Sequence, residues 1–242
     1  MALLTQFLLR LSFGLAVGMA VTSPRLVSSG YFRNHLYVTL GLTTLAASVA
    51  AGISPLVASL AAVAAVLSYV GSVCWLYEAK RAGVALLWCV AACALLAAWA
   101  GEGPGMLRAA SVVTSGLVLG LTLAAMLLGH WYLNSPGMEL APLRHLLVGI
   151  VIAVGAQSLV SVIGLCGHLR HADNVLFSWQ LFVLLRWSFG LLGVWALVWM
   201  AWQTLKIPNT QSATGILYVA VIGVFVGELT GLLLSAESAF PL

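Results

Sequence analysis

The sequence predicts an all-α integral membrane protein with about eight transmembrane helices. Of its 242 residues, 62% are hydrophobic and only 7% are charged, whereas a soluble domain carries roughly a quarter charged residues. The apolar runs are about 20 residues long, which is the length of a helix that crosses a bilayer, and no period-two alternation predicts a barrel. Helices are also expected because the backbone has to satisfy its own hydrogen bonds in lipid.

Eight apolar stretches are separated by short segments that contain glycine, proline and polar residues. The predicted spans cover residues 3–22, 33–52, 54–77, 82–100, 108–133, 143–166, 176–204 and 212–236. None of the connecting segments is long enough to fold into a soluble domain. Residues 1–242 are therefore predicted to form a single polytopic membrane domain, and any soluble chemistry is expected from a partner chain.

The basic residues of the connecting segments predict an orientation. One side of the predicted spans holds six of them, namely Arg25, Arg33, Lys80, Arg81, Arg144 and Lys206. The other side holds only Arg108 and Arg170. Cytoplasmic loops carry the excess of lysine and arginine, so the first side is predicted to face the cytoplasm. Both chain termini are then expected on the non-cytoplasmic side of the cell (inner) membrane.

Short matches between the two parts of the chain indicate an internal repeat. The segment from Ser23 to Leu36 contains a Ser-Pro pair followed by basic and histidine residues, and so does the segment from Ser135 to Leu146. The starts of the spans at 82 and 212 also resemble each other. These matches predict two tandem four-helix halves, 1–105 and 106–242, related by an axis along the membrane normal. The alternative is chance similarity between apolar helices.

Three charged residues lie within the apolar runs: Arg10, Arg186 and Glu228. A charge in this environment is costly and by default marks a functional site. With a rise of about 1.5 Å per residue, all three are predicted at similar depths, between the non-cytoplasmic interface and the midplane. Glu228 is therefore expected to pair with Arg186, with Arg10 or with both.

Two interpretations of this predicted cluster stay open. In the first, Glu228, Arg186 and Arg10 carry the chemistry, as a proton relay or as a polar pocket for a proton, a quinone or an anionic group. In the second, they form a buried ion cluster that locks the first, seventh and eighth spans together. Burial within protein is expected in both cases, because Glu228 directly follows a glycine on a face of small residues.

Glycines recur at intervals of four on three predicted spans: Gly14 and Gly18, Gly116 and Gly120, and Gly223, Gly227 and Gly231. Such faces predict close approach of helix backbones. Tryptophans form a further stripe on the seventh span, with Trp195, Trp199 and Trp202 on one face. This stripe predicts packing or lipid contact, and the alternative is an aromatic wall for a flat cofactor.

Three histidines are predicted near the cytoplasmic interface: His35, His130 and His145. Trp131 and Tyr132 follow His130 directly. Two neutral imidazoles that face each other can ligate the iron of haem b, and a histidine beside aromatic residues can hydrogen-bond a quinone carbonyl. Cofactor binding by these five residues is therefore one interpretation, with quinone favoured over haem b. The other is an interfacial aromatic belt in contact with lipid headgroups.

Several function classes are disfavoured by what the sequence lacks. It contains no G-x-x-x-x-G-K-[ST] loop of a nucleotide motor and no H-E-x-x-H motif of a metalloprotease. The four cysteines form no C-x-x-C pair, and no metal site is predicted. No basic run with interleaved aromatic residues predicts nucleic-acid binding. The expected partners are the lipid bilayer and other membrane protein subunits.

The layout of eight predicted spans in two sets of four resembles the NrfD/PsrC-type membrane subunits of quinone-linked oxidoreductases. The resemblance is one of architecture, and it implies two four-helix bundles with a quinone site and no haem. No residue role is taken from that group.

Three functions follow from these predictions. The favoured one is an integral membrane subunit of a larger electron-transfer complex, of respiratory or photosynthetic type, with a quinone, haem or proton-relay site. The second is a structural or assembly subunit with no chemistry of its own. The third is a carrier of a small solute, which is disfavoured because few polar residues line the spans and no clearly broken helix is predicted.

Overall fold

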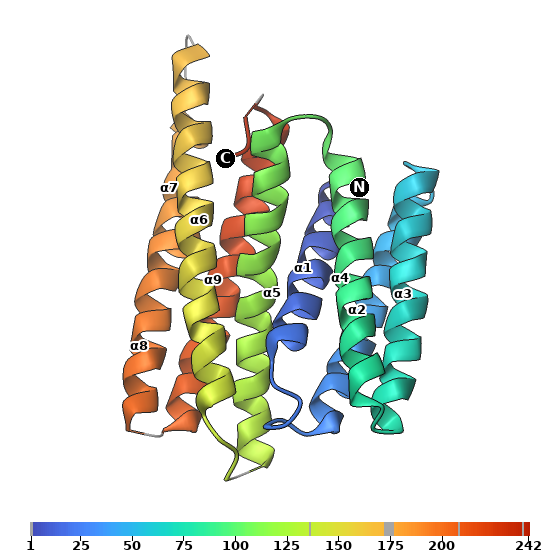
Figure 1. The fold of residues 1–242 in the computed structure, drawn as a ribbon. Helices are drawn as coiled ribbons and strands as arrows, with labels where there is room; N and C mark the ends of the chain where they lie inside the picture. Colours follow the sequence, from blue (N-terminus) through green and yellow to red (C-terminus); the bar gives the residue numbers. More distant parts are fainter. Residues whose placement is uncertain (1, 136, 172–176, 208, 239) are drawn as a thin grey trace.

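The computed structural model describes residues 2–135, 137–171, 177–207, 209–238 and 240–242, and the described residues are almost entirely helical (Figure 1). Its helices are α1 (Ala2–Val21), α2 (Ser29–Ala50), α3 (Pro55–Leu76), α4 (Lys80–Glu102), α5 (Met106–Asn134), α6 (Ala141–His171), α7 (Phe177–Leu185), the π-helical segment η1 (Arg186–Gly193), α8 (Val194–Lys206) and α9 (Thr210–Ala236). Helices α7, η1 and α8 follow one another without a break and form one rod. Residue 176, where the seventh predicted span starts, lies outside the described residues.

Seven of the described helices are long and apolar enough to cross a membrane, counting residues 177–206 as one, so the chain has the character of a multi-pass membrane protein. Helix α2 is outside this set. Its second turn contains Arg33, Asn34 and His35, and further along it carries several threonines, which lower its hydropathy. The predicted membrane-protein class is therefore confirmed in its all-helical, multi-pass character, and the eighth span remains a prediction.

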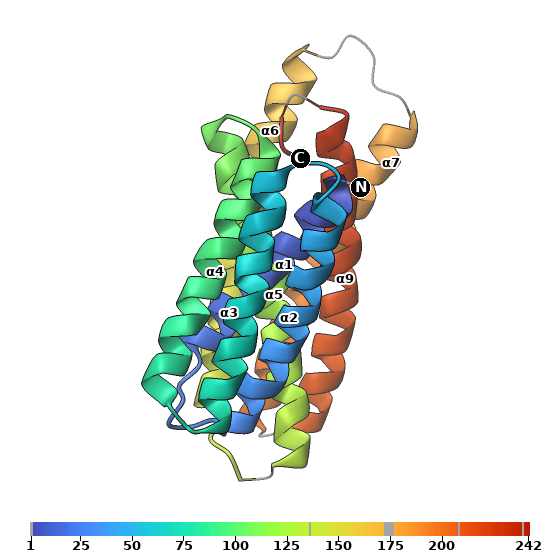
Figure 2. The same cartoon turned by 90° about the vertical axis from the view of Figure 1, so that its right-hand side faces the viewer.

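The helices are grouped in two rings of four. In the first ring, α1 contacts α2, α2 contacts α3, α3 contacts α4, and α4 contacts α1; in the second, α5, α6, α8 and α9 follow one another in the same way. The rings are joined mainly where α1 packs on α5 (Figures 1 and 2). The first ring consists of helices from residues 1–105 and the second of helices from residues 106–242; the relation of the two parts by an internal repeat remains a prediction.

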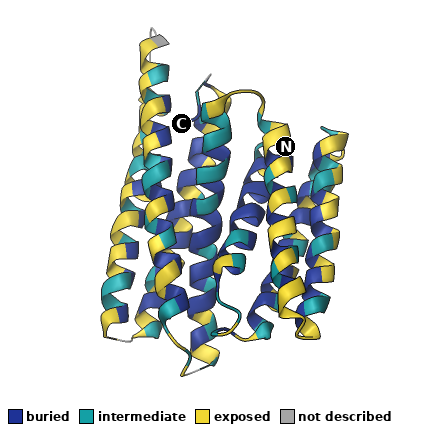
Figure 3. Cartoon of the chain, in the orientation of Figure 1, coloured by how far each residue is buried: buried dark blue, intermediate teal, exposed yellow. Residues whose placement is uncertain are grey.

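Glycines make the closest helix contacts, as their spacing predicts. A Cβ atom built on Gly14 of α1 would overlap the backbone of Gly116 on α5, and one built on Gly120 would overlap the backbone of Gly14. In the second ring, a Cβ on Gly190 would lie 2.5 Å from the Cα of Gly227 on α9. These contacts confirm that the glycine faces bring helix backbones together. The helices with the most continuous burial, α1 and α5, lie at the centre of the bundle (Figure 3).

Both chain termini lie at the same end of the bundle, which we call the terminal end (Figures 1 and 2). The loop between α2 and α3 and the loop between α4 and α5 are also at this end. The rod from Phe177 to Lys206 changes to π-helical geometry over Arg186–Gly193, which the sequence did not lead us to expect. Single π turns within α-helices are frequent at functional sites, and this one begins at a buried arginine.

Candidate functional site

Arg186 and Glu228 form a buried ion pair between η1 and α9. Arg186 is 2% exposed and Glu228 is 3% exposed. The distance from Nη2 of Arg186 to Oε1 of Glu228 is 3.8 Å, which is longer than a hydrogen bond. Within the described part of the chain, Arg186 is the only polar partner that Glu228 has. The carboxylate is thus neutralised by a nearby charge, and no hydrogen bond fixes its orientation.

The guanidinium of Arg186 is held more firmly than the carboxylate. Its Nη1 donates to the carbonyl oxygen of Gly227 at 3.2 Å, and its Nη2 donates to Oγ of Ser161 on α6 at 3.0 Å. Its Nε is buried and has no hydrogen-bond acceptor among the described residues. Gly231 provides the space for this group, since a Cβ there would overlap Nη1. The arginine therefore ties three helices together and keeps one donor without a partner.

The C-terminal residues cover this ion pair at the terminal end. The amide N–H of Leu242 donates to Oγ of Ser235 at 2.9 Å, and the carbonyl oxygen of Leu242 would lie 2.9 Å from a Cβ built on Gly231. A Cβ on Gly164 of α6 would overlap the carbonyl of Pro241. Gly164 on α6 and Gly231 on α9 thus leave space for Pro241 and Leu242 between the two helices, on the side of Arg186 that faces the terminal end.

Arg10 does not join this pair. Its Nη2 donates to Oε2 of Glu102, the last residue of α4, at 2.7 Å, and its Nε donates to Oε1 of Gln6 at 3.4 Å. The amide of Gln6 donates to the carbonyl oxygen of Ala98 at 2.9 Å. The first ring therefore has its own ion pair, in which Arg10 is buried and Glu102 is partly exposed, and the three predicted charges are divided between two sites rather than gathered in one.

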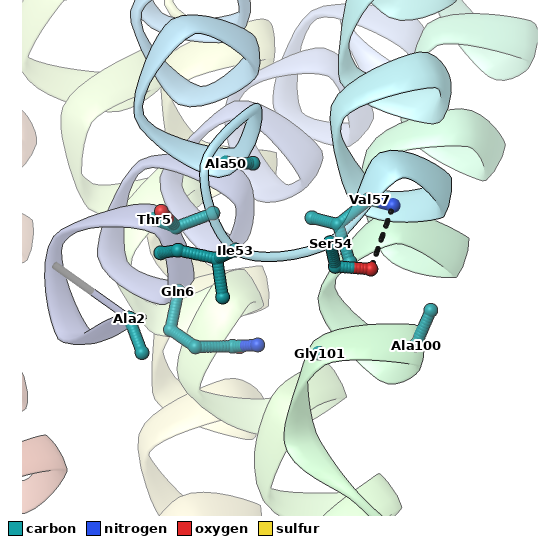
Figure 4. Close-up of a pocket in the computed structure, with 9 residues that line it drawn as sticks. All are labelled: Ala2, Thr5, Gln6, Ala50, Ile53, Ser54, Val57, Ala100 and Gly101. Atoms are coloured by element: carbon teal, nitrogen blue, oxygen red, sulfur yellow. Dashed lines mark hydrogen bonds between the residues drawn. The ribbon is translucent and has the colours of Figure 1, made fainter.

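A pocket of about 180 Å³ opens beside the Arg10 site, at the terminal end of the first ring (Figure 4). It is lined by Ala2, Thr5, Gln6, Ala50, Ile53, Ser54, Val57, Ala100 and Gly101. These residues come from α1, from the junction of α2 and α3, and from the end of α4. The pocket combines polar groups of Thr5, Gln6 and Ser54 with small side chains that leave space between them.

The predicted cofactor residues lie at the opposite end of the bundle. His35 is buried on α2, where its Nδ1 lies 2.6 Å from the carbonyl oxygen of Tyr31 and its ring lies 4.4 Å from the Tyr31 ring. Trp131 on α5 is a further neighbour, with its ring centroid 6.3 Å from that of His35. The structure thus brings His35 and Trp131 together in an aromatic cluster with Tyr31.

The other two histidines are exposed and have different surroundings. Nδ1 of His130 lies 3.4 Å from the hydroxyl of Tyr218 on α9, while His145 lies on the exposed face of α6. The hydroxyl of Tyr132 donates to the carbonyl oxygen of Glu139. Among the described residues, no hydrogen bond or ring contact joins two of the three histidines.

The tryptophan stripe forms one wall of an open groove between α6 and α8. The groove has a volume of about 300 Å³ and is lined by Leu147, Val148, Val151, Trp195, Val198, Trp199 and Trp202. Its lining is almost wholly apolar. In the part of the chain that the structure describes, no hydrogen bond engages the indole N–H of Trp195, Trp199 or Trp202. The groove therefore presents an apolar, largely aromatic surface.

Three residues of these sites have no role predicted from the sequence: Gln6, Glu102 and Ser161. Sequence position offers a signal for two of them. Gln6 lies one helical turn from Arg10 on the same helix, and Glu102 is an acid at the end of α4, which packs beside α1. The described residues contain no group of three histidine, cysteine or acidic side chains placed to hold a metal ion.

The chain was also compared with known proteins. No family model, no curated protein and no solved structure matches it. The geometry of the two ion pairs, the pocket and the groove therefore carries the functional argument.

Proposed function

We propose that this chain is an integral membrane subunit of a larger electron-transfer complex, of respiratory or photosynthetic type, in which Glu228 relays protons. The observation that carries the proposal is the loose ion pair of Arg186 and Glu228. Both side chains are buried, yet their closest N–O distance is 3.8 Å and the carboxylate accepts no hydrogen bond from the described residues. A carboxylate held this way can change its protonation state without breaking a hydrogen bond.

The arginine is suited to remain in place during that change. It keeps its contacts with the Gly227 carbonyl and with Ser161, and a guanidinium does not lose its proton in proteins. When Glu228 takes up a proton, the net charge of the pair rises from zero to plus one. The unpartnered Nε of Arg186 then offers a position for a water molecule or another small acceptor next to the acid.

A lipid-soluble quinone is the redox partner that the groove between α6 and α8 favours. A flat apolar ring can pack on the indoles of Trp195, Trp199 and Trp202, because the lining of the groove is almost wholly apolar and partly aromatic. Reduction of a quinone consumes electrons and protons in equal number, with the electrons supplied by a partner subunit. The predicted layout of eight spans in two sets of four, which resembles the NrfD/PsrC-type subunits, also supports this proposal.

We propose that α2 is the eighth span and that the terminal end faces the non-cytoplasmic side of the inner membrane. The excess of lysine and arginine at the opposite end supports this orientation. Single cysteines at Arg81 and Met106, both exposed and at opposite ends of the bundle, are expected to react with an impermeant thiol reagent from opposite sides. Reaction of both from one side would contradict the orientation.

The decisive experiment compares Glu228→Gln with Glu102→Gln in the purified complex. Each change removes one carboxylate charge that is paired with an arginine and nearly preserves the shape of the side chain; Glu228 is buried, whereas the side chain of Glu102 is 12% exposed. We expect Glu228→Gln to abolish most quinone-linked electron transfer with the complex intact, and Glu102→Gln to leave turnover nearly unchanged. If the purified protein carries no quinone and Glu228→Gln keeps full turnover, the proposal is wrong.

A structural or assembly subunit is the second candidate, and the Arg10–Glu102 pair favours it. In this pair Nη2 of Arg10 lies 2.7 Å from Oε2 of Glu102, which is hydrogen-bonding distance. Backbone contacts between glycines hold the rings together. Both features suit a rigid scaffold that other subunits bind. Loss of complex assembly in variants of both ion pairs, without a selective loss of turnover, would support this candidate instead.

A further inference from the structure

The pocket at the terminal end of the first ring has the properties of a solvent site. Its volume of about 180 Å³ is well above the roughly 10–15 Å³ that a single water molecule needs. Apolar cavities stay dry, whereas roomy sites with several polar partners hold water. Here Thr5, Gln6 and Ser54 line the space with polar side chains, so the pocket contains groups that can bind water.

Gln6 lies at the inner boundary of this pocket. Its side chain is 6% exposed and extends toward the end of α4, close to Gly101 (Figure 4). A Cβ atom built on Gly101 would lie 2.7 Å from Nε2 of Gln6. The glycine therefore provides the space in which the amide lies.

A continuous set of polar contacts leads from the pocket to the buried ion pair. Gln6 accepts from Nε of Arg10 at 3.4 Å, and Arg10 donates to Glu102 at 2.7 Å. Charged groups within a membrane protein face a partner or a water-filled cavity, because burial in hydrocarbon is expensive. Arg10 is paired with Glu102 and also contacts Gln6. Because Gln6 lines the pocket, only this side chain lies between the pocket and Arg10.

We infer that this pocket is a water-filled vestibule whose inner wall is Gln6, and that it places water next to the Arg10–Glu102 pair. Its ligands are water and small hydrogen-bonding solutes that enter from the terminal end. The vestibule lowers the cost of holding two charges inside the first ring. This inference does not depend on the proposed electron-transfer role, since it concerns a different ion pair.

Two positions on α3 provide a matched test. Val57 lines the pocket and is 3% exposed, and Ala61, one helical turn deeper, is 0% exposed and does not line it. The experiment uses the full chain in nanodiscs, with Cys74, Cys89, Cys93 and Cys166 replaced by alanine. Val57→Cys and Ala61→Cys are treated with sulfonatoethyl methanethiosulfonate, a charged reagent that reacts with hydrated thiols.

We expect Val57→Cys to react at least tenfold faster than Ala61→Cys. Adding Gly101→Leu, which fills the pocket and displaces the Gln6 amide, should reduce the rate at Val57→Cys to that of Ala61→Cys. Equal slow rates at the two cysteines would show a dry pocket, and equal fast rates would show general opening of the helices; either result overturns the inference. If Gly101→Leu does not fold, the comparison of the two single-cysteine proteins decides alone.

Discussion

Arg10 on α1 donates to Glu102 at the end of α4 across 2.7 Å, although 92 residues separate them in the chain. The pair closes the first ring, because α1 and α4 are its first and last helices. Arg10 reaches Glu102 by extending toward the terminal end, where Gln6 lies one helical turn away. The contact therefore links the packing of the ring to the polar pocket beside it.

Removal of Glu102 should destabilise the protein strongly. Glu102→Ala leaves the buried Arg10 without its ion partner; breaking a fully buried pair costs about 3–5 kcal/mol, which is an upper bound here because the side chain of Glu102 is 12% exposed. We expect a clear fall in the thermal unfolding midpoint in nanodiscs. Glu139→Ala is the control, since Glu139 is exposed, and it should change the midpoint little. An unchanged midpoint for Glu102→Ala would show that the pair contributes nothing to the ring.

The Arg186–Glu228 pair should show strong coupling in a double-mutant cycle. Arg186→Ala leaves a buried carboxylate without its only described partner, so we expect lower yield and a cost of about 3–5 kcal/mol. The double change with Glu228→Ala removes both charges and should restore part of the lost stability. Additive losses in the double variant would contradict a direct interaction between the two residues.

Gly120 should tolerate no side chain. A Cβ there would overlap the backbone of Gly14, so Gly120→Ala is expected to separate α1 from α5 and to lower the unfolding midpoint substantially. Gly41 on α2 is the control, because a Cβ there meets nothing within 4 Å. Gly41→Ala should be neutral or slightly stabilising, in line with the helix propensity of alanine. Equal effects of the two changes would argue against the close contact.

The hydroxyl of Tyr31 should stabilise the packing of the first ring against the second. It donates to the carbonyl oxygen of Ala124 on α5 at 3.2 Å, and loss of one hydrogen bond costs about 0.5–1.5 kcal/mol. Tyr31→Phe is therefore expected to lower the unfolding midpoint by a few degrees. Tyr37→Phe on the exposed face of the same helix should have no measurable effect. The thermal unfolding curves of the two variants provide the comparison.

Quinone binding should be detectable through the tryptophans of the groove. Titration of a short-chain quinone into the protein in nanodiscs is expected to quench tryptophan fluorescence with saturation. The quenching should lose its saturable part when Trp195, Trp199 and Trp202 are replaced by phenylalanine. Replacement of Trp88 and Trp99, which are exposed on α4, should leave the saturable part unchanged. Quenching without saturation, equal to that by brominated lipid, would exclude a quinone site in the groove.

Composition and run length were sufficient to predict the all-helical membrane class, because the requirement for apolar surface in lipid leaves few alternatives. Glycine spacing also predicted which helix faces approach each other. The pairing of the charges was harder to predict. Depth placed Arg10, Arg186 and Glu228 at one level, but depth does not specify the position around the bundle, and Glu102 reached Arg10 from the end of a neighbouring helix.

The π-helical segment and the pocket could not be predicted for a related reason. The π geometry over Arg186–Gly193 arises within an apolar run with no proline, and nothing in the local pattern distinguishes it from α-helix. The pocket is formed by three separate parts of the chain. Small residues such as Ala50 and Ala100 leave space for it only because the fold brings these parts together. Tertiary packing supplies this information, and residue spacing within one helix does not.

The glycine contact between α1 and α5 also limits how the molecule can move. Many carriers work by rocking one bundle of helices against another, which requires an interface whose side chains can slide and repack. Here the backbones of Gly14, Gly116 and Gly120 are in direct contact, so rotation about this contact would force main-chain atoms into one another. Motion is expected instead along α6 and α8, where an open groove already separates the helices, and large-scale rocking of the two rings is disfavoured.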